Sequence, residues 1–152
     1  MFRGTSQINL DVKGRMVLPA RYRDEVTGDC GGRLILTLDT EKKCLLLYKL
    51  PDWELIESAL FKLPSSNPAV RKMQLILQGH ATDVDMDGSG RILVHPALRP
   101  VVNLDKKIML VGQGRRFEIW DLSAWERERD EILEQGVLNV EGMPEEAFNI
   151  PL

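Results

Sequence analysis

Cysteine is scarce in this sequence, and long hydrophobic runs are missing. Of the 152 residues only Cys30 and Cys44 are cysteines, and their spacing fits no paired metal-ligand motif. No stretch approaches the roughly 20 apolar residues of a membrane-spanning helix, and residues 1–6 contain no apolar core of a secretory signal. We therefore expect free thiols in a cytosolic protein that has no membrane partner.

Motifs that carry catalysis are also absent. His80 and His95 belong to no His-x-x-x-His pair, and the sequence holds no Cys-x-x-Cys or Gly-x-Ser-x-Gly arrangement. A hydrolase that uses Asp87 and His95 is therefore the least favoured class of function. We expect no enzymatic activity and no catalytic residue.

Two partial motifs lack the residues that would complete them. Asp83, Asp85 and Asp87 imitate the opening of a calcium-binding loop, but Val94 occupies the position that needs a bidentate glutamate. The run Gly112-Gln113-Gly114 lacks the rest of a dinucleotide fingerprint and is typical of a hairpin turn. Neither a metal nor a cofactor is therefore expected.

An excess of positive charge is missing as well, because the net formal charge is −3. Its distribution is uneven: residues 1–23 carry a net charge of +4, whereas residues 117–152 carry −8. Ordinary solvated surface charge would explain this pattern if the basic residues lay elsewhere. Because some of them lie in a repeated motif, the pattern is compatible with a localised contact to nucleic acid.

What the sequence does contain is an internal duplication. Asp11-Val12-Lys13-Gly14-Arg15 and Asp87-Gly88-Ser89-Gly90-Arg91 share the pattern Asp-x-x-Gly-Arg, and each opens an apolar run that ends in Pro-Ala. Residues 33–37 then correspond to 107–111, and residues 48–54 correspond to 120–126. A half of about 60 residues is marginally stable alone, so each half needs the other half or a neighbouring subunit.

The repeated motif predicts a tight turn in each half. The carboxylates of Asp11 and Asp87 can accept backbone hydrogen bonds, and Gly14 and Gly90 supply the positive φ that the turn needs. The arginine that follows begins the return strand with its donor fork directed outward. Residue chemistry supports equally an ion pair from this arginine to the aspartate and a contact to nucleic acid, and both can hold together.

Periodicity and turn residues predict a mixed α+β fold. Strands are expected at residues 7–10, 16–18, 33–38, 44–49, 81–85, 91–94, 107–112 and 116–120. Helices are expected at residues 19–26 before Gly28, from Pro51 along the face of Trp53, Ile56, Leu60 and Leu63, at 69–78 between Asn67 and Gly79, from Pro96, and from the capping box at Ser123 to Gly136. The expected domains are a first repeat at 1–63, a linking helix at 64–79, a second repeat at 80–135 and a loosely ordered tail at 136–152.

Taken in order, the two copies resemble the MraZ family from Met1 to about Leu133. The residues that carry the resemblance are Met1-Phe2-Arg3-Gly4, the two Asp-x-x-Gly-Arg turns, Leu45-Leu46-Leu47-Tyr48, Asn67-Pro68, Gly79-His80-Ala81 and Met109-Leu110-Val111-Gly112-Gln113. The resemblance implies two pseudo-symmetric, AbrB-like β-hairpin repeats of the swapped type with accompanying helices. It also implies a bacterial DNA-binding transcriptional regulator that assembles into rings.

The resemblance further indicates a site and its partners. Arg15 and Arg91 would contact double-stranded promoter DNA, at short direct repeats upstream of the division and cell-wall gene cluster, with Lys13 and Arg3 as further DNA-binding residues. Because Ser89, the counterpart of Lys13, is uncharged, the first turn should carry more of the electrostatic binding. The protein would then be cytoplasmic, nucleoid-associated and homo-oligomeric.

The alternative is a non-DNA oligomeric module that uses its helices for protein contacts. In either case two helix faces are candidates for subunit contacts. They consist of Trp53, Ile56 and Leu60 on one helix and of Val70, Met73, Ile76 and Leu77 on the next.

Overall fold

The structure, a computed structural model, describes residues 1–137 and 141–152, and it is mixed α+β as predicted. Residues 1–122 form one compact unit and residues 123–152 a smaller second one. The elements are β1 (Phe2–Asn9), β2 (Arg15–Val17), α1 (Ala20–Cys30), β3 (Arg33–Leu38), β4 (Leu45–Lys49), α2 (Leu50–Phe61), α3 (Pro68–Leu77), β5 (Thr82–Asp85), β6 (Arg91–Leu93), β7 (Lys107–Gly114), β8 (Arg116–Asp121) and α4 (Leu122–Gln135), with 3-10 turns at Pro100–Val102 and Glu145–Asn149. Residues 138–140 of the expected tail lie outside the described residues, and the expected domain boundaries stay a prediction.

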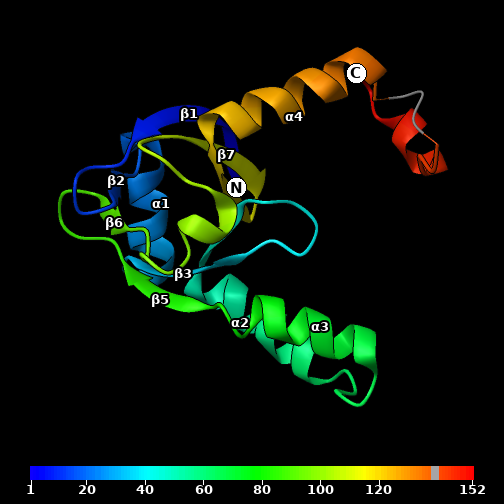
Figure 1. The fold of residues 1–152 in the computed structure, drawn as a ribbon, viewed down its shortest axis with the longest axis horizontal. Helices are drawn as coiled ribbons and strands as arrows, with labels where there is room; N and C mark the ends of the chain where they lie inside the picture. The colour runs from blue at the N-terminus through cyan, green and yellow to red at the C-terminus, as the bar shows by residue number, and fades with distance from the viewer. Residues whose placement is uncertain (138–140) are drawn as a thin grey trace. The chain divides into compact units, whose positions relative to one another are not determined.

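The strands of the two repeats are exchanged. A six-stranded antiparallel sheet has the order β1-β7-β8-β4-β3-β5, and β2 pairs with β6 as a separate ribbon. Each strand that enters a predicted turn therefore pairs with the other repeat: β1 with β7, and β5 with β3. As a result the two turns project from the same side of the first unit, beside the labels β2 and β6 in Figure 1.

Buried side chains of both repeats share one core. Phe2 on β1 stacks on Phe117 of β8 with ring centroids 4.0 Å apart, and Tyr22 of α1 meets both rings edge-on. Such aromatic pairs contribute about 0.5–1.5 kcal/mol beyond the area they bury. The cluster therefore holds the first repeat against the second.

The helices α2 and α3 extend away from the sheet in Figure 1. Asn67 caps α3 as predicted, since its side chain accepts hydrogen bonds from the backbone N–H groups of Ala69 and Val70. The expectation that Trp53 and Leu60 form subunit contacts is wrong, because they are only 2% and 4% exposed within this chain. The large apolar side chains that these two helices and their connection expose are Leu55, Phe61, Leu63, Met73 and Leu75.

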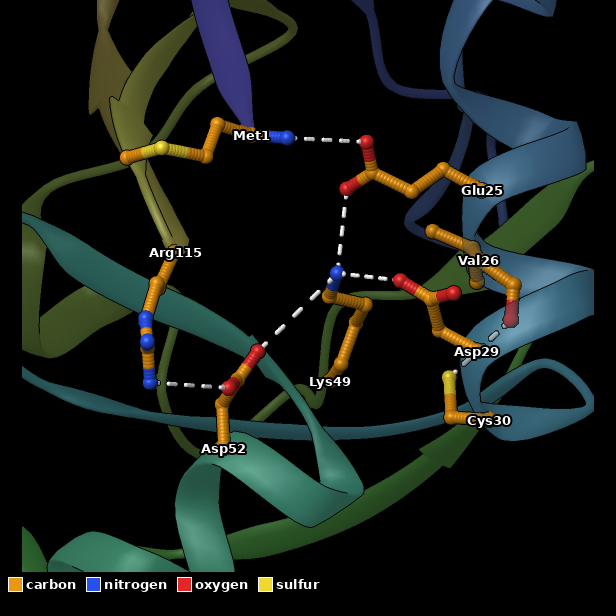
Figure 2. A network of polar contacts seen from close by, with 8 residues as sticks. All are labelled: Met1, Glu25, Val26, Asp29, Cys30, Lys49, Asp52 and Arg115. Atoms are coloured by element: carbon orange, nitrogen blue, oxygen red, sulfur yellow. Dashed lines mark hydrogen bonds and ion pairs between the residues drawn. The ribbon is translucent and has the colours of Figure 1, made fainter.

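A lysine joins α1, β4 and the start of α2 (Figure 2). The Nζ atom of Lys49 lies 3.0 Å from Glu25, 2.7 Å from Asp29 and 4.0 Å from Asp52. Burial alone would lower the pKa of Lys49, but hydrogen bonds to the two carboxylates of α1 raise it. The lysine therefore stays charged and fixes α1 over the sheet.

Three helix predictions differ from the structure. The first helix does not end before Gly28 but runs to Cys30, because Gly31 provides the left-handed residue (φ 60°) that ends it. No α-helix follows Pro96, since Pro100 has no N–H to donate to the carbonyl of Pro96. Ser123 is the second residue of α4 rather than its cap, because the helix begins directly after β8.

None of the helices within the described residues is long and apolar enough to cross a membrane.

The position of Gly28 inside α1 gives a testable prediction. A Cβ atom there would meet no atom of the described residues within 4 Å, so Gly28→Ala should raise the free energy of unfolding by about 0.5–1 kcal/mol. The control is Gly31→Ala at φ 60°, which should lower it by roughly 1–2 kcal/mol. Urea denaturation measures both, and a destabilised Gly28→Ala protein would contradict the helix boundary.

Candidate nucleic-acid interface

The two turns have the same hydrogen-bond pattern. In the first, one Asp11 oxygen accepts from the backbone N–H groups of Lys13 and Arg15, each at 2.9 Å, and the other accepts from Nε of Arg15 at 2.8 Å. In the second, Asp87 accepts from the N–H groups of Ser89 and Arg91 at 2.9 Å and from Nε of Arg91 at 2.7 Å. Each aspartate therefore accepts three hydrogen bonds within its own turn, and its turn-shaping role stays a prediction.

These hydrogen bonds keep both aspartates charged. The backbone N–H of Arg15 is the largest influence on the pKa of Asp11, and with the arginine side chain it holds that pKa below the usual value of an aspartate. The N–H of Arg91 has the same effect on the pKa of Asp87. Each arginine is therefore braced through Nε, while its two terminal nitrogens have no protein partner within the described residues.

The glycines of the turns are held by the opposite repeat. Gly14 and Gly90 have φ values of 81° and 77°, which only glycine adopts readily. The carbonyl of Gly14 accepts a hydrogen bond from Val94 N–H at 2.9 Å, and the carbonyl of Gly90 accepts one from Leu18 N–H at 2.8 Å. These two bonds continue the β2–β6 ribbon into both turns.

The ribbon has one buried and one open face. Met16 and Ile92 are paired across it and fully buried. Because strand residues alternate, their neighbours point the other way. Those neighbours pair as Arg15 with Leu93 and as Val17 with Arg91. The open face therefore presents two arginines and two aliphatic side chains that are nearly half exposed.

Two further lysines lie beside the first turn, which the sequence alone does not reveal. Leu10, just before the first turn, donates its N–H to the carbonyl of Lys106, and the next residue, Lys107, pairs with Asn9. Beside the second turn, Asp85 pairs instead with Arg33. The repeat correspondence did match residues 33–37 to 107–111, but only the strand pairing places the two lysines beside the first turn.

Arg3 is not brought to the turns. It lies near the start of β1, paired with Gln113, and at about 3.3 Å per residue it is roughly 23 Å along the strand from Leu10. Its carbonyl accepts a hydrogen bond from the hydroxyl of Tyr22. Arg3 as a DNA-binding residue therefore stays a prediction without support from the geometry of the ribbon.

Both histidines make hydrogen bonds within the chain, and Asp83, Asp85 and Asp87 lie on β5 or in the second turn. The Nδ1 atom of His95 accepts a hydrogen bond from Ala97 N–H at 3.1 Å, and His80 Nδ1 lies 3.0 Å from the carbonyl of Ile76. Within the described part of the chain, no group of three or more His, Cys, Asp or Glu side chains is placed to hold a metal ion. Gly112-Gln113-Gly114 ends β7 at the hairpin to β8.

The exchanged strands and the paired turns define a duplicated hairpin protein, built from two like repeats. The sequence matches the MraZ protein family, described as antitoxin-like, over residues 1–76 and again over residues 77–141. Over its full length and theirs, the chain is 51% identical to the transcriptional regulator MraZ of Alkalilimnicola ehrlichii and 46% identical to that of Coxiella burnetii. It is 50% identical to that of Pseudomonas aeruginosa over 125 residues, which cover 82% of this chain and 83% of the relative.

The chain therefore belongs to the MraZ family of transcriptional regulators, which are not enzymes. The predicted family, the mixed α+β class and the duplication are confirmed.

The lowered pKa of Asp11 fixes the sign of a pH dependence. A carboxylate whose pKa is lower in the folded than in the unfolded state adds stability above its unfolded pKa, and this stability is lost as the pH falls through the folded pKa. Asp11→Asn should therefore be less stable than the wild type by a constant amount above about pH 5, and the difference should shrink below pH 3.8.

Thermal unfolding across this pH range measures the difference. Asp24→Asn, at an exposed position on α1, is the matched control and should change little. A stability difference for Asp11→Asn that grew on acidification would contradict the brace.

Proposed function

We propose that the protein is a sequence-specific DNA-binding transcriptional regulator whose β2–β6 ribbon contacts double-stranded DNA through Arg15 and Arg91. The supporting observation is that both arginines are braced through Nε on one open face, with their terminal nitrogens unused by the described residues. A guanidinium fork held in this way loses little freedom when it bonds a base edge or a phosphate.

The shape of the ribbon favours the major groove. A two-stranded β-ribbon fits that groove, where arginine donates in pairs to guanine O6 and N7, and where aliphatic side chains contact the methyl group of thymine. The exposed Val17 and Leu93, each beside an arginine, suit the second type of contact.

Phosphate contacts would come mainly from the first turn. Lys13 is exposed in that turn, and Lys106 and Lys107 lie beside it, whereas Asp83 and Asp85 lead into the second turn. Lysine side chains neutralise phosphates and release counterions without reading sequence.

The DNA targets would be promoter direct repeats upstream of the division and cell-wall gene cluster. The protein would then be cytoplasmic and nucleoid-associated.

A ring-like homo-oligomer would supply the missing affinity. A micromolar dissociation constant requires about 8 kcal/mol, whereas one arginine fork contributes roughly 1–3 kcal/mol. Chains in a ring could place their ribbons on successive DNA repeats and so multiply weak contacts. The exposed apolar residues of α2 and α3, among them Leu55, Met73 and Leu75, are the surface for such contacts.

The second candidate, a protein-interaction module without DNA binding, rests on the same exposed helices. No residue of α3 is buried, although the helix carries several large apolar side chains. Gel shifts with promoter fragments separate the two candidates.

Replacing either arginine tests the DNA contact. Arg15→Ala and Arg91→Ala should each weaken specific binding by about 1–3 kcal/mol and leave the circular dichroism spectrum unchanged. The matched control is Lys43→Ala, which removes one positive charge from the exposed loop between β3 and β4. Lys13→Ala should instead lower the slope of log K against log salt by about 1. Normal DNA affinity in a folded Arg15→Ala protein would contradict the proposed DNA contact by Arg15.

The exposed face of α3 gives the prediction for assembly. Leu75→Glu should reduce the mass measured by light scattering and weaken binding to a probe with several repeats more than binding to a single repeat. Leu133→Glu on α4, where the leucine is also exposed, serves as the control. A wild-type monomer that binds one repeat as tightly as the array would show that assembly is not needed.

A further inference from the structure

An arginine of the second repeat lies flat on the glycine of the first turn. A Cβ atom built on Gly14 would come within 2.5 Å of Cζ of Arg99 and within 2.6 Å and 2.7 Å of its two terminal nitrogens. All three atoms lie at nearly the same distance from this Cβ position, so the face of the guanidinium group covers the glycine. The absence of a side chain at Gly14 therefore makes this contact possible.

The second turn has the reciprocal contact. A Cβ atom at Gly90 would clash with Nε of Arg23 and lie 2.8 Å from its Cδ and Cζ atoms. Arg23 belongs to α1 of the first repeat, whereas Arg99 follows β6 of the second. Each turn is thus covered by an arginine from the other repeat, in addition to the backbone hydrogen bond to its glycine carbonyl.

The two covering arginines differ in what holds them. Nε of Arg23 donates to the carbonyl of Leu18 at 2.8 Å, and the N–H of the same Leu18 binds Gly90. Nε of Arg99 is buried and has no partner within the described residues. Arg99 also borders an open cleft of about 530 Å³ beside the first turn. Because its Nε has no hydrogen bond to the described residues, packing against Gly14 helps to position Arg99.

We propose that Arg99 and Arg23 are positioning residues for DNA binding, each acting on the turn of the opposite repeat. Arg99 holds Gly14 and so sets the direction of Arg15, the next residue. Arg23 holds Gly90 and so sets the direction of Arg91. The inference rests on the proposed DNA contact by Arg15 and Arg91, and it makes each repeat responsible for the contact made by the other.

A direct phosphate contact by these two arginines is the competing role. The geometry favours positioning, because one face of each guanidinium is covered by a turn and Nε of Arg23 is already used inside the protein. The two roles also differ in chemistry. Lysine can replace arginine at a phosphate, but it has no planar group to lie on a glycine.

Double-mutant cycles on DNA affinity distinguish the two roles. Arg99→Met should weaken specific binding about tenfold in the wild-type background, have almost no effect when Arg15 is already alanine, and keep its full effect when Arg91 is alanine. Arg23→Met should show the opposite pattern, and it is the matched control within the same chain. Measurements at low salt keep the binding of the weaker variants within range.

Arg99→Lys and the salt dependence complete the test. For a positioning residue, Arg99→Lys should not restore affinity, and the salt slope of Arg99→Met should equal that of the wild type. Equal losses in both arginine backgrounds, a smaller salt slope, rescue by lysine, or undiminished affinity of Arg99→Met would each overturn the proposal. If Arg99→Met unfolds, Arg99→Gln replaces it in the same cycle.

The failure of the proposed function gives a different result. If Arg15→Ala binds DNA like the wild type, the DNA contact itself is wrong, whatever the Arg99 variants do. If Arg15→Ala weakens binding but Arg99→Met does not, only the positioning role is wrong.

Discussion

The pairing of β2 with β6 is the interaction on which the rest of the structure depends. These strands are only three residues long, yet their ladder continues into the carbonyls of Gly14 and Gly90. The same ladder buries Met16 and Ile92 in the shared core. Because the two strands come from different repeats, neither turn can form its full set of hydrogen bonds without the other repeat.

The exchange of strands also explains how a marginal repeat becomes stable. A half of about 60 residues buries too little surface to be stable alone. Here β1 pairs with β7, β4 with β8 and β3 with β5, so the main sheet crosses the boundary between repeats three times. The stacked rings of Phe2 and Phe117 close the same boundary from inside the core. The contacts between the two repeats therefore stabilise the fold and also keep β2 and β6, the two strands of the candidate interface, side by side.

Local chemistry was enough to predict the turns from the sequence. An aspartate followed by glycine and arginine specifies its own hydrogen bonds, and Asn67 specifies a helix cap in the same way. Strand partners could not be predicted in this way, because pairing depends on residues far apart in the chain. For the same reason the sequence did not reveal Lys106 and Lys107 beside the first turn or Arg99 over Gly14. The helix expected after Pro96 is not formed, and Pro100 is a local signal against it. The expectation followed the helix of the first copy instead.

In the proposed function, the open face of the ribbon reads base edges in the major groove. Methylation interference with dimethyl sulfate tests it directly on a promoter fragment that the protein shifts in a gel, since the reagent modifies guanine N7 in the major groove and adenine N3 in the minor groove. We predict that binding is lost when specific guanines carry the N7 methyl group and is retained when adenines carry the N3 methyl group. Interference confined to adenine N3 would place the protein in the minor groove and contradict the proposed major-groove contact.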